Sequence, residues 1–326
     1  MPATRATGSE EDVEQDEPLM KRPEETAEQK AATEHSNIVW GVVAYAFCSA
    51  SLLVINKVAV NAIPSPSFVL TCQLIASVVA VLGLKEMNIL SDVESLKFEK
   101  VRLFIGISLL FCLCLWTNVK ALEYANVETV IVFRACSPIA VAFCDYLFLG
   151  QALPSMRSWL SLIVIVLGAI LYVLTDDGFV VKAYVWVCLY FVGITVEMVY
   201  VKYVVEAVDM STWSRVYYNN VLSIIPTLML GASFNEFAPL TTVEWTYNSI
   251  IALALSCAVG VGISYAGFNL RKLVTATTFT VIGVLCKICS VLLNLVIWDK
   301  HANSTGIFAL VICILAGTFY QQSSKR

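Results

Sequence analysis

Charged residues are scarce in this chain of 326 residues. They make up 14% of it, against about 25% in an average soluble protein. Hydrophobic residues make up 58%, where about 45–50% is usual. So few charges cannot cover the surface of a soluble domain, and so apolar a chain does not stay disordered. The composition excludes a soluble enzyme, a nucleic-acid binder and a disordered chain. It indicates a polytopic protein whose main surroundings are a lipid bilayer.

The first 37 residues lack Trp, Tyr, Phe and Ile. They hold ten acids and four bases, a net charge of −6, so the rest of the chain carries +2 within the overall −4. Such a segment cannot bury enough apolar surface to offset its ordering entropy, and we expect residues 1–37 to be a disordered acidic tail. The first apolar run begins only near Ile38, without the basic start of a signal peptide, so the first helix is expected to act as a signal anchor.

Metal-binding and catalytic motifs are also missing. The chain has two histidines, His35 and His301, and its eleven cysteines all fall inside apolar runs without zinc-site spacing. It contains no Walker sequence, no G-x-S-x-G elbow and no H-E-x-x-H. We therefore expect no catalytic residue, no metal and no cofactor, and the chain is not expected to be an enzyme.

Ten apolar runs approach the length of about 17–25 residues that crosses a bilayer. The sequence thus predicts an all-α fold with ten transmembrane helices. The predicted spans are 38–60, 66–84, 101–122, 127–149, 158–174, 180–201, 212–234, 249–268, 273–297 and 305–321.

Basic residues are distributed unequally between the two sets of connections. Connections after even-numbered spans, with the C-terminus, hold eleven, whereas connections after odd-numbered spans hold only Lys182 and Lys300. By the positive-inside rule, the first set and both termini are cytosolic. The eleven are Lys85, Lys97, Lys100, Arg102, Arg157, Lys202, Arg215, Arg271, Lys272, Lys325 and Arg326.

The chain also matches itself when it is shifted by 149 positions. Thr129 then falls on Thr278, Gly168 on Gly317, and the loop at Gly150 on the loop at Asp299. This predicts two repeats of five helices, residues 38–176 and 177–326. Because five is odd, the repeats would be inverted, which is typical of secondary carriers with a substrate site between the halves.

Four basic residues fall inside predicted spans: Lys57, Lys120, Arg134 and Lys287. Each is costly in hydrocarbon. Glu197 is the clearest acid to oppose them, so the interior is net positive and favours a polyanionic ligand. Internal ion pairing with snorkelling at span ends is the alternative, above all for Lys57 and Lys120.

The seventh span carries Tyr217-Tyr218-Asn219-Asn220. Lipid cannot supply hydrogen-bond partners for two adjacent side-chain amides, so these amides bind either another helix or a ligand. An amide can donate and accept in one plane, which suits the edge of guanine, and a tyrosine can stack on the ring.

These residues resemble the F-Y-N-N motif of GDP-sugar transporters. Gly283-Val284-Leu285-Cys286-Lys287 is similar to that family's G-A-L-N-K motif. Four further stretches resemble the plant Golgi branch that handles GDP-fucose and GDP-mannose: Val54–Lys57, Ile131–Arg134, Glu197–Tyr200 and Val296–His301. The resemblance covers nearly the whole chain after residue 38. The resemblance places the chain in the drug/metabolite transporter superfamily. It implies exchange of a cytosolic GDP-sugar for lumenal GMP across the Golgi membrane. A homodimer is the assembly to be tested.

The resemblance also implies roles for single residues. Asn219 and Asn220 would bind guanine, Lys287 the diphosphate, and Gly283 would let the backbone approach the substrate. Ser264 matches a serine near the sugar and nucleotide.

The chain departs from the family at four positions. Cys286, Val284, Phe279 and Gly267 replace an asparagine, an alanine, a tyrosine and a serine. Three of these changes remove polar groups from the expected sugar end, which favours a deoxy sugar such as fucose.

Two other functions stay open. One is a UDP-sugar or sugar-phosphate/phosphate exchanger of the same superfamily. The other is a membrane receptor or scaffold that uses the acidic tail as a binding arm.

Overall fold

The structure is a computed structural model and describes residues 27–124, 127–173, 181–297 and 304–326. In this part of the chain all ten predicted helices are present, with one short 3-10 helix (Ala238–Thr241), so the all-α prediction is confirmed. The chain divides into residues 1–36 and 37–326, and the contacts below concern the second unit. The helices are α1 (Ala27–Ala62), α2 (Pro66–Glu86), α3 (Phe98–Tyr124), α4 (Val127–Phe148), α5 (Met156–Val173), α6 (Val181–Ala207), α7 (Thr212–Ser233), α8 (Tyr247–Leu273), α9 (Ala276–Ile297) and α10 (Ser304–Thr318).

Five helical segments of the described residues are long and apolar enough to cross a membrane. They are Ala32–Ala62, Pro66–Glu86, Phe98–Ala121, Val185–Ala207 and Tyr247–Leu273. Two shorter apolar segments lie in α5 and α9. A bilayer-spanning helix needs about 20 apolar residues, so these five segments indicate a multi-pass membrane protein.

The first helix begins earlier than predicted. The expected disordered tail reaches residue 37, but α1 already starts at Ala27. Its first turns are rich in Ala, Glu and Gln, which have high helix propensity. The helix thus extends into the last residues of the expected tail, residues 1–26 lie outside the described part, and the tail itself stays a prediction.

Eight of the eleven bases that were assigned to connections lie within helices: Lys85, Lys100, Arg102, Arg157, Lys202, Arg215, Arg271 and Lys272. Two of them, Arg215 and Lys202, are buried against the ends of other helices. The Arg215 guanidinium donates to the carbonyls of Val205 (2.9 Å) and Val208 (3.1 Å) at the end of α6. The Lys202 ammonium donates to the carbonyl of Arg271 (2.9 Å) near the end of α8. The last carbonyls of a helix lack intrahelical donors and attract cations, which explains why these bases are buried at helix ends.

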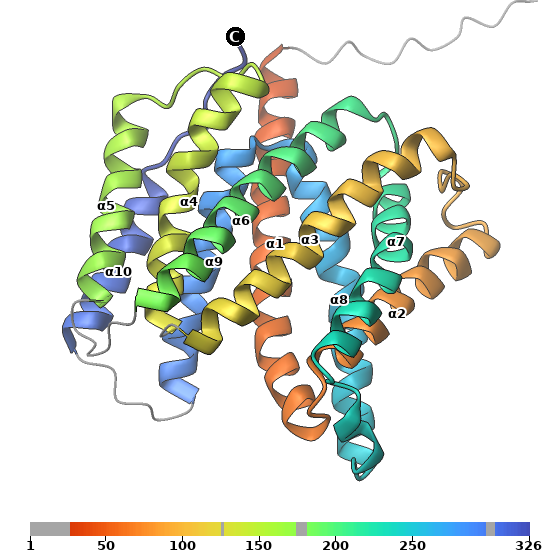
Figure 1. The fold of residues 1–326 in the computed structure, drawn as a ribbon. Coiled ribbons are helices and arrows are strands. Elements are labelled where there is room, and N and C mark those ends of the chain that lie inside the picture. Colours follow the sequence, from red (N-terminus) through yellow and green to blue (C-terminus); the bar gives the residue numbers. More distant parts are fainter. Residues whose placement is uncertain (1–26, 125–126, 174–180, 298–303) are drawn as a thin grey trace, which may run out of the picture. The chain divides into compact units, whose positions relative to one another are not determined.

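The described helices pack in two groups (Figure 1). In one, α4 and α5 lie against α9 and α10 over a core that includes Ile165, Val284 and Ile288. In the other, α2 and α3 pack against α6, α7 and α8 over a core around Phe104 and Tyr218. Contacts of α6 with α4 and of α8 with α9 join the two groups, and the residues of α1 from Asn37 onward contact α8 and α9.

Several predicted features lie outside the described residues. They include Lys300, His301, the Asp299 loop of the repeat match and the boundary between residues 176 and 177. Of the stretch Val296–His301, only the backbone of the first two residues is described.

Candidate functional site

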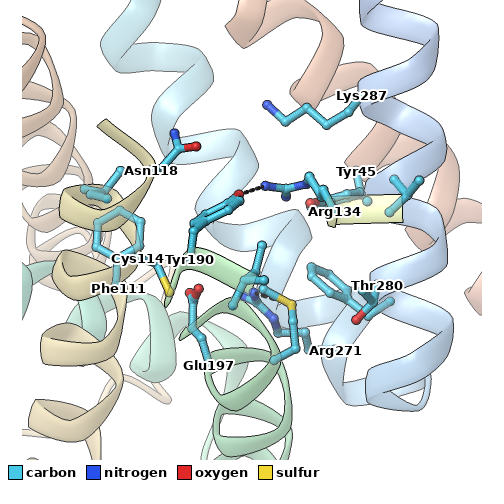
Figure 2. Close-up of a pocket in the computed structure, with 16 residues that line it drawn as sticks. Tyr45, Phe111, Cys114, Asn118, Arg134, Tyr190, Glu197, Arg271, Thr280 and Lys287 are labelled. Atoms are coloured by element: carbon cyan, nitrogen blue, oxygen red, sulfur yellow. Dashed lines mark hydrogen bonds between the residues drawn. The ribbon is translucent and has the colours of Figure 1, made fainter. Parts of the chain in front are cut away.

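A first cavity of about 300 Å³ lies among α1, α3, α4, α6, α8 and α9 (Figure 2). The volume is at the lower end for small-molecule sites. Three cationic side chains line it, and they come from three different helices. They are Arg134 of α4, Arg271 of α8 and Lys287 of α9.

A second cavity of about 270 Å³ lies among α1, α2, α3, α6, α7, α8 and α9. Arg271 lines this cavity as well, but most of the cavity's other polar groups are amides and hydroxyls. They belong to Gln73, Ser77, Asn219, Asn220 and Ser264.

The two cavities adjoin one another. Five residues line both of them: Tyr45, Phe111, Glu197, Arg271 and Phe279. We call these five the shared wall. The pair of cavities thus forms one extended site with a cationic part and an amide part on either side of this wall.

Lys287 is exposed to the first cavity from the middle of α9. One helical turn earlier, a methyl group added to Gly283 would meet no atom within 4 Å. The glycine therefore leaves open space beside the lysine, which lets a ligand approach the backbone of α9.

Helix α9 is held against α4 at its first turn. The Asp145 carboxylate accepts hydrogen bonds from the backbone N–H of Thr277 (2.8 Å) and from its hydroxyl (2.6 Å). A carboxylate at a helix N-terminus satisfies donors that have no intrahelical acceptor. Asp145 thus anchors the helix that carries Lys287.

The Arg134 guanidinium donates a hydrogen bond to the Tyr190 hydroxyl at 2.5 Å. Figure 2 shows Arg134, Lys287 and Glu197 reaching into the same space from α4, α9 and α6. In the shared wall, the Arg271 guanidinium lies 4.2 Å from the centroid of the Phe279 ring. Its Nε is buried without a hydrogen-bond partner among the described residues. Stacked guanidinium groups with spare donors can bind an anion.

The amide part is built around α7 and α8. The Asn220 amide nitrogen donates to the carbonyl of Val216 at 2.7 Å, which leaves its amide oxygen outside that bond. Asn219 and Ser264 line the same cavity and are only partly buried.

Gln73 is fixed by two hydrogen bonds from its amide nitrogen, to the Asn56 side-chain oxygen (2.8 Å) and to the Ser256 hydroxyl (2.5 Å). Its amide oxygen takes part in neither bond. Gly260 permits this contact, because a methyl group there would lie 3.0 Å from the Gln73 side chain. Asn56 thus orients a residue of the cavity.

The structure brings together six of the eight residues predicted to bind substrate: Asn219, Asn220, Ser264, Phe279, Gly283 and Lys287. Tyr217 and Tyr218 line neither cavity. Tyr218 is fully buried, and its hydroxyl donates to the carbonyl of Ser95 (2.5 Å) and accepts from the N–H of Lys97 (2.8 Å). Tyr217 packs against the same core.

The four charged residues predicted to assist binding are Lys57, Lys120, Arg134 and Glu197, and only two of them line a cavity. Arg134 and Glu197 line the cavities, whereas Lys57 and Lys120 line neither. The Lys120 ammonium lies 5.6 Å from the centroid of the Phe234 ring.

Sequence reasoning missed several residues of the site. Arg271 was counted as a connection residue because it directly precedes Lys272 at a span end. Tyr45, Tyr190 and Gln73 carry no local signal, since a single tyrosine or glutamine in a span is also common in packing. Asn118 also lines the first cavity and was not among the predicted site residues.

The arrangement favours a ligand with an anionic end and a planar polar end. The described residues contain no group of three or more His, Cys, Asp or Glu that could hold a metal ion. The Arg and Lys side chains of the cationic part are common phosphate ligands and can bind an anion directly.

Comparison with known proteins gives consistent relatives. Residues 36–174 match the EamA-like transporter family. The chain is 39% identical over 294 residues to GDP-fucose transporter 1 of Arabidopsis thaliana, covering 87% of this chain and 85% of that protein. It is 38% identical over 295 residues to GDP-mannose transporter GONST3 of the same plant, covering 88% and 79%. A GDP-mannose transporter of Komagataella pastoris is 24% identical over 305 residues, covering 86% and 90%.

A solved crystal structure superposes on the chain with a TM-score of 0.65. The match covers 87% of this chain and 96% of the other at 14% identity, so it shows a shared fold alone.

Proposed function

Because the chain belongs to the GDP-sugar transporter family, we propose that it is a Golgi antiporter that exchanges a cytosolic GDP-sugar for lumenal GMP by alternating access. Its relatives at 38–39% identity are transporters of GDP-fucose and of GDP-mannose, not enzymes. The sugar of this chain's own substrate would be of one of these two types.

One observation carries the proposal. The asparagine pair of α7 and the lysine of α9 line adjoining cavities that share a wall. In the proposed complex, guanine lies in the amide part, where Asn219 and Asn220 face its donors and carbonyl. The diphosphate lies in the cationic part, where Lys287 and Arg134 contact its oxygens. GMP presents the same base and one phosphate, so one site serves both exchanged nucleotides.

The proposed architecture is two inverted repeats that together span the membrane ten times. Three contacts support it, because α2 packs against α7, α4 against α9 and α5 against α10, each pair five helices apart. Both halves supply the first cavity: α1, α3 and α4 from one, and α6, α8 and α9 from the other. A site between halves is what rocking-type alternating access requires.

Tyr45, Phe279 and Arg271 form the proposed barrier on one side of the site. The rings of Tyr45 and Phe279 have centroids 5.1 Å apart, and the Arg271 guanidinium stacks on Phe279. Tyr45 belongs to the first half, and Phe279 and Arg271 belong to the second, so a movement of one half against the other would separate Tyr45 from the other two. The excess of basic residues at the α8–α9 side supports a cytosolic position for this barrier and for both termini.

Exchange in proteoliposomes tests the proposal. Vesicles loaded with GMP should take up labelled GDP-fucose or GDP-mannose, and empty vesicles should not. Uptake of UDP-sugars at the same rate, or uptake independent of internal nucleotide, would contradict the proposal. Exchange of inorganic phosphate or a sugar phosphate in place of GMP would favour the other exchanger of this superfamily.

Deletion of residues 1–37 separates a carrier from a receptor or scaffold. A carrier keeps exchange without the tail. The homodimer stays a prediction, to be checked by the mass of the purified protein in detergent.

A further inference from the structure

The two cavities contain one acid among three bases. Arg134, Arg271, Lys287 and Glu197 are the only formally charged residues among the described side chains that line either cavity. Their formal charges sum to +2. Without Glu197 the sum would be +3.

Glu197 lies at the centre of this site. It belongs to the shared wall and is 8% exposed. In Figure 2 its carboxyl group points into the first cavity, next to the sulfur of Cys114. Among the described residues it forms no ion pair within 4 Å, so neither Arg134 nor Arg271 is neutralised by direct contact. Its charge therefore acts on the cavity as a whole.

The proposed substrates share a charge. A GDP-sugar has one ionised oxygen on each phosphorus and carries −2. GMP has a phosphate monoester, which carries about −1.5 to −2 at pH 7. GDP has the same terminal group and a further ionised oxygen, so it carries about −2.5 to −3. The formal charge of +2 in the site balances the negative charge of a GDP-sugar or of GMP. It is smaller than the negative charge of GDP.

We propose that Glu197 is a specificity-determining residue that makes the carrier select dianionic guanine nucleotides and discriminate against GDP. A carboxylate in the wall repels the third negative charge of GDP. It also leaves the site electrically neutral with either exchanged ligand, so both loaded forms cross the conformational barrier without unpaired charge. This inference rests on the proposed function.

The test compares Glu197→Gln with the protein itself in vesicles loaded with GMP. Uptake of labelled GMP is competed with unlabelled GMP, GDP and GDP-mannose. Removal of the Glu197 carboxylate should make GDP about tenfold more potent, relative to GMP, as a competitor of labelled GMP uptake. This change corresponds to about 1.4 kcal/mol. Coulomb's law gives an effect of this size for unit charges about 10 Å apart at an effective dielectric constant of about 20.

Two matched variants show whether charge is the cause. Glu197→Asp keeps the acid and should keep the original ratio of GDP to GMP potency. The double variant Glu197→Gln with Arg271→Gln returns the formal sum to +2 and should restore most of that ratio, which a purely structural role of Glu197 would not do.

If Glu197→Gln does not transport, the same comparison is made by binding. The rise in Tm of the purified variant with GMP or GDP reports relative affinity. An unchanged ratio in Glu197→Gln overturns the inference, because the carboxyl group would then carry no charge that the ligand senses. Absence of GMP-dependent exchange in the unmodified protein would instead overturn the proposed function itself.

Discussion

The two cavities differ in how many partners their polar groups have within the protein. In the amide part, Asn220 bonds its own helix and Gln73 bonds two other helices. In the cationic part, Lys287 is exposed to the cavity and Arg271 has a buried Nε without a hydrogen-bond partner among the described residues. Fixed amides suit selection of one base, whereas under-satisfied cations suit tight binding of any phosphate group. The difference suggests that affinity and base specificity are separable by mutation.

Lys287→Ala is the strongest test of the cationic part. Loss of a charge-assisted bond to phosphate costs about 1.5–3 kcal/mol, and the net charge of the site falls as well. The lost bond alone corresponds to a fall of about 10- to 150-fold. With the loss of net charge, exchange of GMP should fall about a hundredfold, measured as the initial rate of labelled GMP uptake. Lys272→Ala is the control, because this exposed lysine of α8 lines neither cavity. Equal losses in both variants would mean that Lys287 has no special role.

Asn220→Ala is the corresponding test of the amide part. It should lower the preference for GMP over UMP about tenfold to a hundredfold, since a site that loses its hydrogen-bonding groups discriminates poorly. Asn248→Ala, at an exposed position near the start of α8, is the control. A variant that transports slowly but still prefers guanine would show that base specificity resides elsewhere, with Gln73 as the next candidate.

The sequence predicted the helices well because length and hydropathy determine them locally. It also predicted Lys287 and the asparagine pair, since a charge or two amides inside an apolar run are locally anomalous. Arg271 could not be found in this way. It stands next to Lys272 at the end of a span, and only the packing of Phe279 against it shows that its side chain turns inward.

Tyr218 illustrates the opposite error. It belongs to the four-residue motif of α7, yet adjacent helix positions face about 100° apart. Asn219 and Asn220 therefore reach the cavity while Tyr218 faces the core. Motif membership alone does not say which side of a helix a residue occupies.

Gly283 and Gly317 allow a test of whether a glycine leaves room for a ligand or for the packing of another helix. Gly283→Ala places a methyl group where no atom lies within 4 Å, so Tm should hardly change while exchange falls several-fold. Gly317→Ala places it against the Leu285 side chain of α9. Overpacking of this kind costs about 1–3 kcal/mol, so Tm should drop by several degrees. Tm and GMP exchange of the two purified variants check this, and a shared response would contradict the assignment of Gly283 to the ligand space.

Phe279→Tyr is expected to have the smallest effect, and it tests the wall between the two parts. Phe279 lines both cavities, at a position where the resemblance to GDP-sugar transporters predicts a tyrosine. A new hydroxyl beside the site can bond a sugar hydroxyl but also needs a partner when it is empty. We therefore expect uptake of GDP-mannose to rise two- to fivefold relative to GDP-fucose, with the GMP exchange rate little changed. Because the proposed base and phosphate contacts lie on either side of this ring, a shift in guanine preference instead of sugar preference would place the sugar away from the wall.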